Sequence, residues 1–327
     1  MTISILGGGV WGSALAKLFS DQKVLIYTRD KKVMNSINEH HFNPKLKYAV
    51  FNDNVQATDD LEEVVKKNLI LIALPSQHIR EILEKSCFNN LQADIIIASK
   101  GIEISSSLFL SQLVETLIKP KSLSILSGPC FSDEVAKDLP TAATFASSNS
   151  AIFDKISMML SGKKFRIYYS EDIIGCQIGG ALKNIYAIAA GISDGLNLGE
   201  NARSALITRS FVEISRFAMF FKSKKETIFG LSGLGDLILT CNSSKSRNTN
   251  FGIKIANIKH KNFEKELDKN AITEGYYTTK AAIKIASENN IEMPILESVF
   301  NILYNGFDIE GEINQLMSRP LTIENIN

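Results

Sequence analysis

The sequence has few residues that could bind a metal ion or form disulfide bonds. Its 327 residues include only four cysteines and four histidines. The cysteines lie far apart and form no CxxC pair: Cys87, Cys130, Cys176 and Cys241. This spacing argues against both a zinc site and a disulfide framework, so we expect no metal. Reduced thiols are typical of the cytoplasm, which we predict as the compartment.

The chain also lacks an excess of charge of one sign. It has 36 Lys and Arg residues against 35 Asp and Glu residues, a formal net charge of +1. Nucleic-acid binding requires a basic stripe, so we expect no nucleic-acid partner. The first residues run directly into a strand-like pattern without the basic region and cleavage site of a signal peptide.

One apolar stretch, Ile173–Ile192, is long enough to cross a membrane, but it contains Lys183 and several glycines. A lysine near the middle of a bilayer costs roughly 2.5–3.5 kcal/mol on insertion scales. The stretch therefore predicts a buried helix of a soluble protein, without membrane insertion.

Short apolar runs alternate with amphipathic stretches in the first half of the chain, which predicts a doubly wound parallel sheet, or Rossmann domain. The predicted strands are Thr2–Leu6, Val24–Tyr27, Leu69–Leu74, Asp94–Ala98 and Leu123–Leu126, with Thr141–Ala146 and Phe165–Tyr169 as possible additions. The predicted helices between them are Ser13–Ser20, Asp30–Glu39, Asp59–Lys66, Ser76–Lys85 and Ser107–Ile118.

The pattern changes near Ser170. The later sequence has helical periodicity over Ile173–Ile192, Ala202–Phe221, Ala281–Glu288 and Ile295–Tyr304, without convincing strands. The length suffices for two cored domains. We therefore predict a dinucleotide-binding α/β domain over residues 1–170 and a mainly α-helical substrate and catalytic domain over residues 171–327.

A glycine-rich turn follows the first predicted strand. Gly7, Gly9 and Gly12 occupy the positions of a G-x-G-x-x-G motif. The first glycine permits a tight turn, the second admits a pyrophosphate, and the third allows close packing of helix and strand. Because the motif lies between a strand and a helix, it favours a nucleotide cofactor site over a structural turn.

In dinucleotide-binding domains, a residue at the end of the second strand contacts the ribose of the cofactor. An acidic residue there would indicate NAD, but this sequence has Thr28 and Arg29. A guanidinium can pair with a 2′-phosphate, so we favour NADP over NAD. The alternative is that Arg29 is solvated and Asp30 only caps the next helix.

A single lysine, Lys183, interrupts the apolar helix of the second half. Burial lowers the pKa of an ammonium group, which prepares it to donate or accept a proton. The small residues Gly179, Gly180 and Ala187 lie within a turn of it, which would leave room for a substrate. The alternative is that its stem is buried and its ammonium reaches solvent.

The histidines give no better acid/base candidate. We expect all four to be surface residues: His40, His41, His78 and His260. Lys183 is therefore the leading candidate for the acid/base residue, by elimination of the histidines as well as by its apolar surroundings.

Further polar residues lie in glycine-rich or serine-rich segments. Asp236 could orient Lys183, accept a hydrogen bond from substrate, or cap a helix. Arg247 and Asn248, after Ser246, carry donors suited to a phosphate, although the segment could also be a solvated loop. Lys100 follows a predicted strand, at the sheet edge where ligands of open α/β sheets bind. Ser127-Gly128-Pro129-Cys130 follows the next strand in the same way.

In this order and spacing, the motifs resemble the bacterial type of NAD(P)-dependent glycerol-3-phosphate dehydrogenase. The resemblance extends from Ile3 to about Thr279. It rests on the turn ending in Trp11-Gly12, Ser99–Glu103, Ser127–Pro129, Ala181–Asn184, Ala189–Gly195, Gly233–Leu237, Ser246–Asn248 and Glu274-Gly275.

The resemblance implies reversible reduction of dihydroxyacetone phosphate to sn-glycerol 3-phosphate, a precursor of phospholipids, with Lys183 as proton donor and acceptor. It implies a substrate site formed by Lys100, Gly128, Cys130, Lys183, Asp236, Ser246, Arg247 and Asn248. It implies cofactor contacts from Trp11, Arg29, Lys100, Ser132, Arg247, Ile272 and Glu274, in addition to the glycine turn. Cys130 and Ser132 depart from the family's usual small hydroxyl residue and alanine. Base rates for soluble enzymes predict a homodimer.

Two other functions remain possible from the residues alone. A 3-hydroxyacid or 6-phosphogluconate type dehydrogenase has a similar architecture, but usually places asparagine one turn after the lysine, where this chain has Ala187. An NAD(P)-binding sensor without catalysis is compatible with the fold. Retention of Lys183, Asp236 and Arg247 together argues against the sensor.

Overall fold

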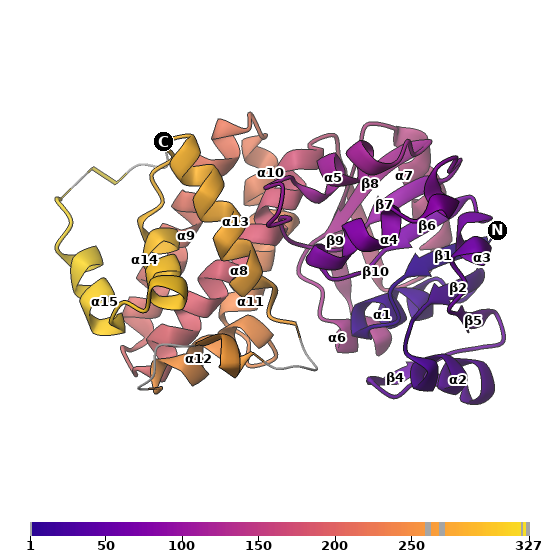
Figure 1. The fold of residues 1–327 in the computed structure, drawn as a ribbon, viewed down its shortest axis with the longest axis horizontal. Helices are drawn as coiled ribbons and strands as arrows, with labels where there is room; N and C mark the ends of the chain where they lie inside the picture. Colours follow the sequence, from indigo (N-terminus) through magenta and orange to yellow (C-terminus); the bar gives the residue numbers. More distant parts are fainter. Residues whose placement is uncertain (1, 259–262, 268–271, 322, 325–327) are drawn as a thin grey trace. The chain divides into compact units, whose positions relative to one another are not determined.

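A computed structural model describes residues 2–258, 263–267, 272–321, 323 and 324 (Figure 1). The chain forms two compact units. Unit 1 contains the residues up to Ser99 together with Leu110–Ile173. Unit 2 contains Lys100–Phe109 and the chain from Ile174 onward. Lys100 therefore belongs to the second unit, although the sequence on both sides of its segment belongs to the first.

Unit 1 is built on an eight-stranded sheet with the order β10-β9-β8-β7-β6-β1-β2-β5. Neighbouring strands from β5 to β8 are parallel, whereas β9 is antiparallel to β8 and parallel to β10. The strands are β1 (Thr2–Leu6), β2 (Lys23–Tyr27), β5 (Val55–Thr58), β6 (Leu69–Ile72), β7 (Asp94–Ile97), β8 (Ser122–Ser127), β9 (Thr141–Ser147) and β10 (Phe165–Ser170).

The central strands are continuously buried, as expected for parallel strands covered on both faces. Every residue of β6 and β7 is buried. In the parallel register, Leu6 pairs with Tyr27 on one side and with Ile72 on the other. The carboxyl ends of β1, β2 and β6 therefore lie side by side, and the segments that follow them share one edge of the sheet.

The helices of unit 1 lie between these strands in sequence, and several begin at the polar residues expected of helix caps. Asp30 accepts hydrogen bonds from the backbone N–H groups of Lys32 and Val33, and Asn149 accepts one from Ala151. The helices are α1 (Val10–Leu18), α2 (Lys31–His40), α3 (Leu61–Val65), α4 (Ile79–Leu83), α5 (Leu110–Leu117), α6 (Ser132–Ala136) and α7 (Ser150–Met159). This arrangement confirms the predicted α/β fold.

Three features of unit 1 were not predicted. A hairpin of β3 (Phe42–Asn43) and β4 (Leu46–Val50) follows α2, and β5 forms the edge strand. These segments are short and rich in polar residues, so periodicity does not distinguish them from loops. The antiparallel direction of β9 was also missed, because apolar patterning does not give the direction of a strand.

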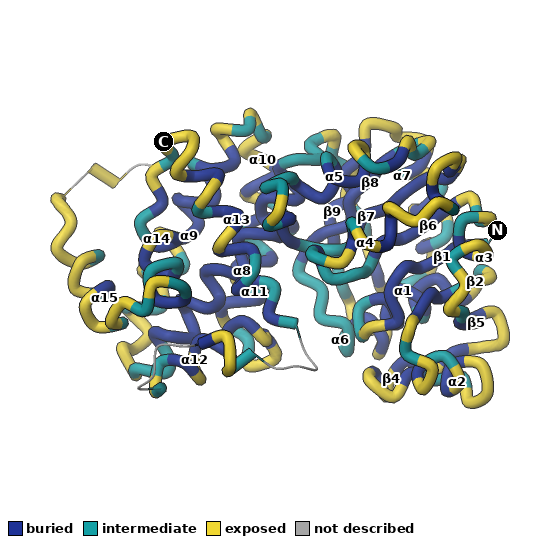
Figure 2. Tube along the Cα trace, viewed as in Figure 1, coloured by how far each residue is buried: buried dark blue, intermediate teal, exposed yellow. Residues whose placement is uncertain are grey.

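The regular secondary structure of unit 2 is helical among its described residues, as predicted, apart from an isolated antiparallel bridge between Ile102 and Phe109. Its apolar core includes residues of α8 (Ile173–Gly195), and every residue from Gly175 to Ser193 is buried (Figure 2). The other α-helices are α9 (Glu200–Phe220), α10 (Lys225–Phe229), α11 (Asp236–Cys241), α12 (Arg247–Ala256), α13 (Glu274–Glu288), α14 (Pro294–Phe300) and α15 (Ile309–Met317). Residues Leu231–Gly235 and Asn301–Asn305 form short π-helices, and the latter ends the predicted helix Ile295–Tyr304.

A buried carboxylate joins three of these helices. Glu213 of α9 accepts hydrogen bonds from the hydroxyl of Tyr186 in α8 and from the N–H groups of Ile295 and Leu296 in α14. Burial raises the pKa of Glu213 to about 7. The carboxylate thereby satisfies N–H groups at the start of α14, which have no partner within the helix.

Helix α8 is the only described helix that is long and apolar enough to cross a membrane. Most of its residues are buried inside unit 2. It is therefore a core helix of unit 2, as the sequence predicts.

Helices α8 and α12 cross with their backbones in close contact. A Cβ atom at Gly191 would lie 2.0 Å from the Thr249 carbonyl oxygen, and one at Gly252 would lie 2.1 Å from that of Ile188. Neither carbonyl can move without disturbing its helix. The crossing therefore requires glycine at both positions.

We expect Gly252→Ala to lower the free energy of unfolding by about 1–3 kcal/mol, the usual cost of overpacking a core. Chemical denaturation measures this change. Gly311→Ala in α15 is the matched control, because its Cβ would have no neighbour closer than 3.7 Å. Equal stability of the two variants would show that the α8–α12 crossing tolerates a methyl group.

Candidate functional site

The glycine-rich turn connects β1 to α1, and the protein itself requires two of its predicted glycines. Gly7 has a φ of +124°, and a Cβ there would lie 2.6 Å from the carbonyl oxygen of Ala73. A Cβ at Gly12 would lie 1.9 Å from the carbonyl oxygen of Gly7. These contacts match the tight turn and the close helix–strand packing expected of the first and third glycines.

Gly9 differs from both, because a Cβ there would meet nothing within 4 Å. Gly9 has extended backbone angles, and it occupies the cap position of α1 without a side chain that could satisfy the first N–H groups. The open space therefore lies beside backbone donors and the positive end of a helix dipole, the usual surroundings of a bound phosphate. The turn fits a dinucleotide pyrophosphate.

Hydrogen bonds of two side chains join this turn to other segments of unit 1. The indole N–H of Trp11 donates to the carbonyl oxygen of Ala98, after β7, at 3.0 Å. The amide of Asn43, from the β3–β4 hairpin, donates to the carbonyl oxygen of Gly8 at 3.0 Å and to Ser13 Oγ at 2.6 Å. Sequence reasoning missed Asn43, since only the fold brings the hairpin to the turn.

Arg29 and Asp30 follow β2 at the same sheet edge. Asp30 caps α2 and pairs with Lys45, which lowers the pKa of its carboxyl group. Arg29 has a largely exposed side chain that pairs with Glu81 of α4 at 2.9 Å. Asp30 therefore caps the next helix and also pairs with Lys45, and Arg29 is largely exposed and paired with a carboxylate.

The residues predicted after β8 lie together in unit 1. A Cβ at Gly128 would lie 2.8 Å from the Cα atom of Ala143 in β9, so the strand packing requires glycine. The thiol of Cys130 is partly buried and lies 3.9 Å from the carbonyl oxygen of Ala142. Ser132 is the first residue of α6, which packs against α1.

In unit 2, Lys183 is buried in the middle of α8 and donates hydrogen bonds to two residues of α11. Its ammonium group donates to a carboxylate oxygen of Asp236 and, at 2.8 Å, to Thr240 Oγ1. The ammonium group of Lys100 pairs with the other carboxylate oxygen of Asp236. Asp236 is fully buried and Lys183 is buried, whereas Lys100 is partly exposed, so two cations share one buried carboxylate.

Burial is the largest influence on the ammonium group of Lys183 and lowers its pKa. The Asp236 carboxylate opposes this effect, and the positive charge of Lys100 adds to it. The resulting pKa is about 8, well below the ordinary value of 10.5. Lys183 can therefore exchange a proton near neutral pH, and its ammonium does not simply reach solvent.

Asp236 does not cap α11: it is the first residue of that helix, Gly235 occupies the cap position, and no side chain caps it. The π-helix Leu231–Gly235 leads directly into α11 and packs on α8. A Cβ at Gly179 would lie 2.3 Å from the carbonyl oxygen of Ser232. The prediction that Gly179 leaves room for a substrate is therefore wrong. This glycine admits the backbone that carries Asp236.

Ser246, Arg247 and Asn248 form the start of α12. Ser246 caps the helix through a hydrogen bond from the N–H of Thr249. Arg247 is exposed, and no described residue pairs with it. The side chain of Asn248 donates to Asn184 Oδ1 and accepts from the N–H of Gly275, both at 2.9 Å. The nitrogen and the oxygen of the Asn248 amide therefore both form hydrogen bonds, which join α12 to α8 and α13.

The remaining predicted residues take no part in the contacts described above. Ile272 precedes α13 and is partly buried, and Glu274 is the first residue of that helix. His40, His41 and His78 have partly or largely exposed side chains, as expected, whereas His260 lies outside the described residues.

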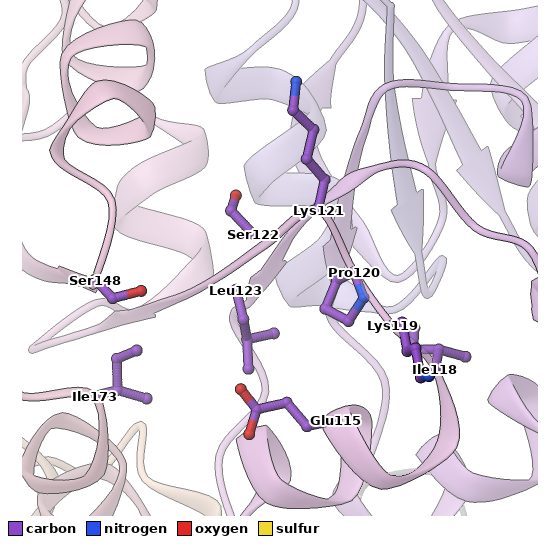
Figure 3. Close-up of a pocket in the computed structure, with 9 residues that line it drawn as sticks. All are labelled: Glu115, Ile118, Lys119, Pro120, Lys121, Ser122, Leu123, Ser148 and Ile173. Atoms are coloured by element: carbon purple, nitrogen blue, oxygen red, sulfur yellow. The ribbon is translucent and has the colours of Figure 1, made fainter.

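A shallow groove of about 310 Å³ lies at the beginning of β8 in unit 1 (Figure 3). It is lined by Glu115, Ile118, Lys119, Pro120, Lys121, Ser122, Leu123, Ser148 and Ile173. None of the predicted site residues lines it, and Gly128 follows the opposite end of β8. Among the described residues, no group of three His, Cys, Asp or Glu side chains could hold a metal ion.

Comparison with known proteins supplies the family. Residues 2–153 match the N-terminal part of NAD-dependent glycerol-3-phosphate dehydrogenase, and residues 172–314 match its C-terminal part. A glycerol-3-phosphate dehydrogenase [NAD(P)+] of Thermotoga sp. is 41% identical over 99% of both chains. One of Zymomonas mobilis is 38% identical over 98% of this chain and 93% of the relative. The chain belongs to the glycerol-3-phosphate dehydrogenase family.

Solved structures agree with this assignment. The crystal structure of glycerol-3-phosphate dehydrogenase from Coxiella burnetii has a TM-score of 0.90 and 35% identity, over 97% of this chain and 99% of that chain. The predicted family and enzyme class are confirmed: the protein is an oxidoreductase of the glycerol-3-phosphate dehydrogenase family, which uses NAD(P).

Two residues of this dehydrogenase, Thr240 and Asn184, contact predicted site residues but were not themselves predicted as site residues. Thr240 lies one turn after Asp236 in α11 and contacts Lys183, and Asn184 contacts Asn248. The spacing from Asp236 to Thr240 was a usable signal, because residues four apart share one face of a helix. Asn184 directly follows Lys183 in the sequence, but its partner is 64 residues away.

The pKa of Lys183 predicts how stability depends on pH. Between about pH 8 and 10.5 the folded protein has released this proton while the unfolded chain retains it, so the contribution of Lys183 to stability increases with pH. Replacing it with methionine removes a penalty that is present at pH 7 and absent above pH 10.5. The stability of Lys183→Met relative to wild type should therefore fall by on the order of 3 kcal/mol from pH 7 to pH 10.5.

Chemical denaturation at several pH values measures this difference. Lys284→Met, which replaces an exposed lysine of α13, is the control and should give a difference that changes little with pH. A flat difference for Lys183→Met as well would mean that the ammonium group is not destabilised by burial.

Proposed function

We propose that this chain reversibly reduces dihydroxyacetone phosphate to sn-glycerol 3-phosphate with NADPH or NADH, and that it supplies phospholipid synthesis. We also propose that it acts in the cytoplasm as a homodimer. The observation that carries the proposed reaction is the Lys183 ammonium group, which is buried against Asp236 with a pKa of about 8. This residue occupies the position that the family resemblance gives to the proton donor.

In this mechanism Lys183 donates a proton to the C2 oxygen of the ketone, on which negative charge develops. The bound nicotinamide supplies the hydride. Asp236 and Thr240 hold the Lys183 ammonium group in one orientation, so its proton is directed before the reaction begins. Lys100 keeps the Lys183 pKa low and adds a positive charge that stabilises a developing alkoxide.

The substrate phosphate is proposed to bind at the start of α12. Arg247 is exposed there and can form two parallel hydrogen bonds to phosphate oxygens. The first N–H groups of the helix and its dipole add to this attraction. Asn248 fixes the position of α12 through Asn184 and Gly275, while Gly128 and Cys130 of unit 1 are proposed to contact substrate. Binding of the non-reacting phosphate helps to position C2.

The cofactor is proposed to bind through the turn at Gly9 and the start of α1, with its pyrophosphate in the open space beside Gly9. Further proposed contacts come from Trp11, Arg29, Lys100, Ser132, Arg247, Ile272 and Glu274. Arg29 follows β2, where the ribose of a dinucleotide is read, and supports a preference for NADP over NAD.

An assay of NADPH oxidation with dihydroxyacetone phosphate tests the reaction. We expect turnover by the wild-type protein, with kcat/KM nearly constant below about pH 8 and falling above it as Lys183 loses its proton. Lys183→Ala should reduce kcat by at least about 100-fold, the usual contribution of a general acid, without greatly changing NADPH affinity. Lys284→Ala is the matched control and should resemble wild type.

Near-wild-type turnover by Lys183→Ala would remove this residue from the chemistry. A wild-type protein that binds NADPH but reduces a 3-hydroxyacid precursor instead would favour the other dehydrogenase class. Cofactor binding without turnover of any such substrate would favour a sensor.

Cofactor preference is tested by the ratio of kcat/KM with NADPH to kcat/KM with NADH. Arg29→Asp should shift this ratio toward NADH by about tenfold or more, because a carboxylate repels a 2′-phosphate and accepts from ribose hydroxyls. Glu81→Gln should shift it toward NADPH, because it frees the Arg29 guanidinium from its ion pair. Unchanged ratios in both variants would show that Arg29 does not read the ribose.

A further inference from the structure

Asn43 is a fully buried polar residue outside the predicted site. It lies in β3, the first strand of the hairpin that follows α2. Strand β4 of the hairpin packs against α1, and Leu46 and Ala49 of that strand belong to the apolar core of unit 1. The hydroxyl of Ser36 donates to the carbonyl oxygen of Phe42 at 2.9 Å. The backbone that carries Asn43 is therefore held in place from two sides.

The hydrogen bonds of Asn43 define the orientation of its amide. Its Oδ1 accepts from the N–H of Lys45 at 2.9 Å, while its Nδ2 donates to the carbonyl oxygen of Gly8 and to Ser13 Oγ. The opposite orientation would bring two acceptors together at Gly8 and two donors together at Lys45. The side chain therefore presents donors to the turn in one arrangement only.

The two acceptors of the Asn43 amide, in Gly8 and Ser13, lie at opposite ends of the proposed pyrophosphate site, which is the turn at Gly9 and the start of α1. Gly8 precedes Gly9, and Ser13 is in the first turns of α1. A peptide group is planar and trans, so a fixed carbonyl group at Gly8 also fixes the opposite direction of the Gly9 N–H. Three consecutive glycines would otherwise allow this peptide to rotate at low cost.

We infer that Asn43 is a positioning residue for the cofactor: it holds the Gly8–Gly9 peptide and the start of α1 in the arrangement that receives the pyrophosphate. The inference rests on the proposed cofactor site. A preorganised turn binds more tightly because it does not have to be ordered when the ligand arrives. Asn43 itself need not touch the cofactor.

The test measures cofactor affinity directly, by fluorescence titration of the full-length protein with NADPH and with NADH. We expect Asn43→Ala to raise both dissociation constants about tenfold or more. In the steady state it should raise the KM for NADPH, with much smaller changes in kcat and in the KM for dihydroxyacetone phosphate. Asn43→Asp, which keeps the shape but replaces the donors with an acceptor, should weaken cofactor binding at least as much.

Asn38→Ala is the matched control. The Asn38 side chain also forms two hydrogen bonds to backbone in unit 1, to the N–H and carbonyl groups of Ala57, but it does not contact the turn. Thermal unfolding of each variant without cofactor gives its loss of stability. Cofactor affinity should fall in the Asn43 variants and remain within about twofold of wild type in Asn38→Ala.

Cofactor dissociation constants that are alike in Asn43→Ala, Asn43→Asp and Asn38→Ala would overturn the inference and leave the proposed function intact. If Asn43→Ala fails to fold, the isosteric Asn43→Asp decides between the two results. A wild-type protein that binds neither nucleotide would overturn the proposed cofactor site, and the role of Asn43 with it.

Discussion

The contact of the Asp236 carboxylate with two ammonium groups is the interaction on which the packing around α8 in unit 2 depends. Lys183 lies in a helix that is buried along most of its length, where a cation without a partner would be strongly destabilising. Asp236 compensates that charge, and Lys100 occupies its second oxygen. Removal of Asp236 would leave two ammonium groups without a counter-charge, whereas removal of either lysine would leave a neutral pair. The three segments that carry Lys100, Lys183 and Asp236 must therefore lie close together.

The backbone around this cluster reflects that constraint. The π-helix Leu231–Gly235 brings Asp236 to α8, and Gly179 permits the close approach. Segment Lys100–Phe109 belongs to unit 2 although the residues before and after it in sequence belong to unit 1. The glycines Gly191 and Gly252 bring α12 equally close to α8. Small residues along α8 therefore serve the approach of other backbone segments, while the polar side chains between them carry the proposed chemistry.

The two proposed sites use different parts of the polypeptide. In unit 2 side chains form the proposed site, through charge and hydrogen bonds around Lys183. In unit 1 the glycine turn offers backbone N–H groups and a helix dipole, which attract a phosphate without any charged side chain. A backbone site is only as well defined as its peptide orientations. The hydrogen bond from Trp11 to Ala98 and the hydrogen bond from Asn43 to Gly8 supply that definition by joining the turn to neighbouring segments.

The sequence by itself determined the features that depend on neighbouring residues: the alternation of strands and helices, the glycine turn and the apolar helix with its single lysine. Periodicity and short-range backbone geometry are local properties, so they can be read along the chain. Only the tertiary structure decided the direction of β9, the position of the Asn43 hairpin and the partner of Lys183. Asp236 is 53 residues from Lys183 and 136 residues from Lys100. Contacts over such separations are selected by the packing of whole elements, which no local pattern records.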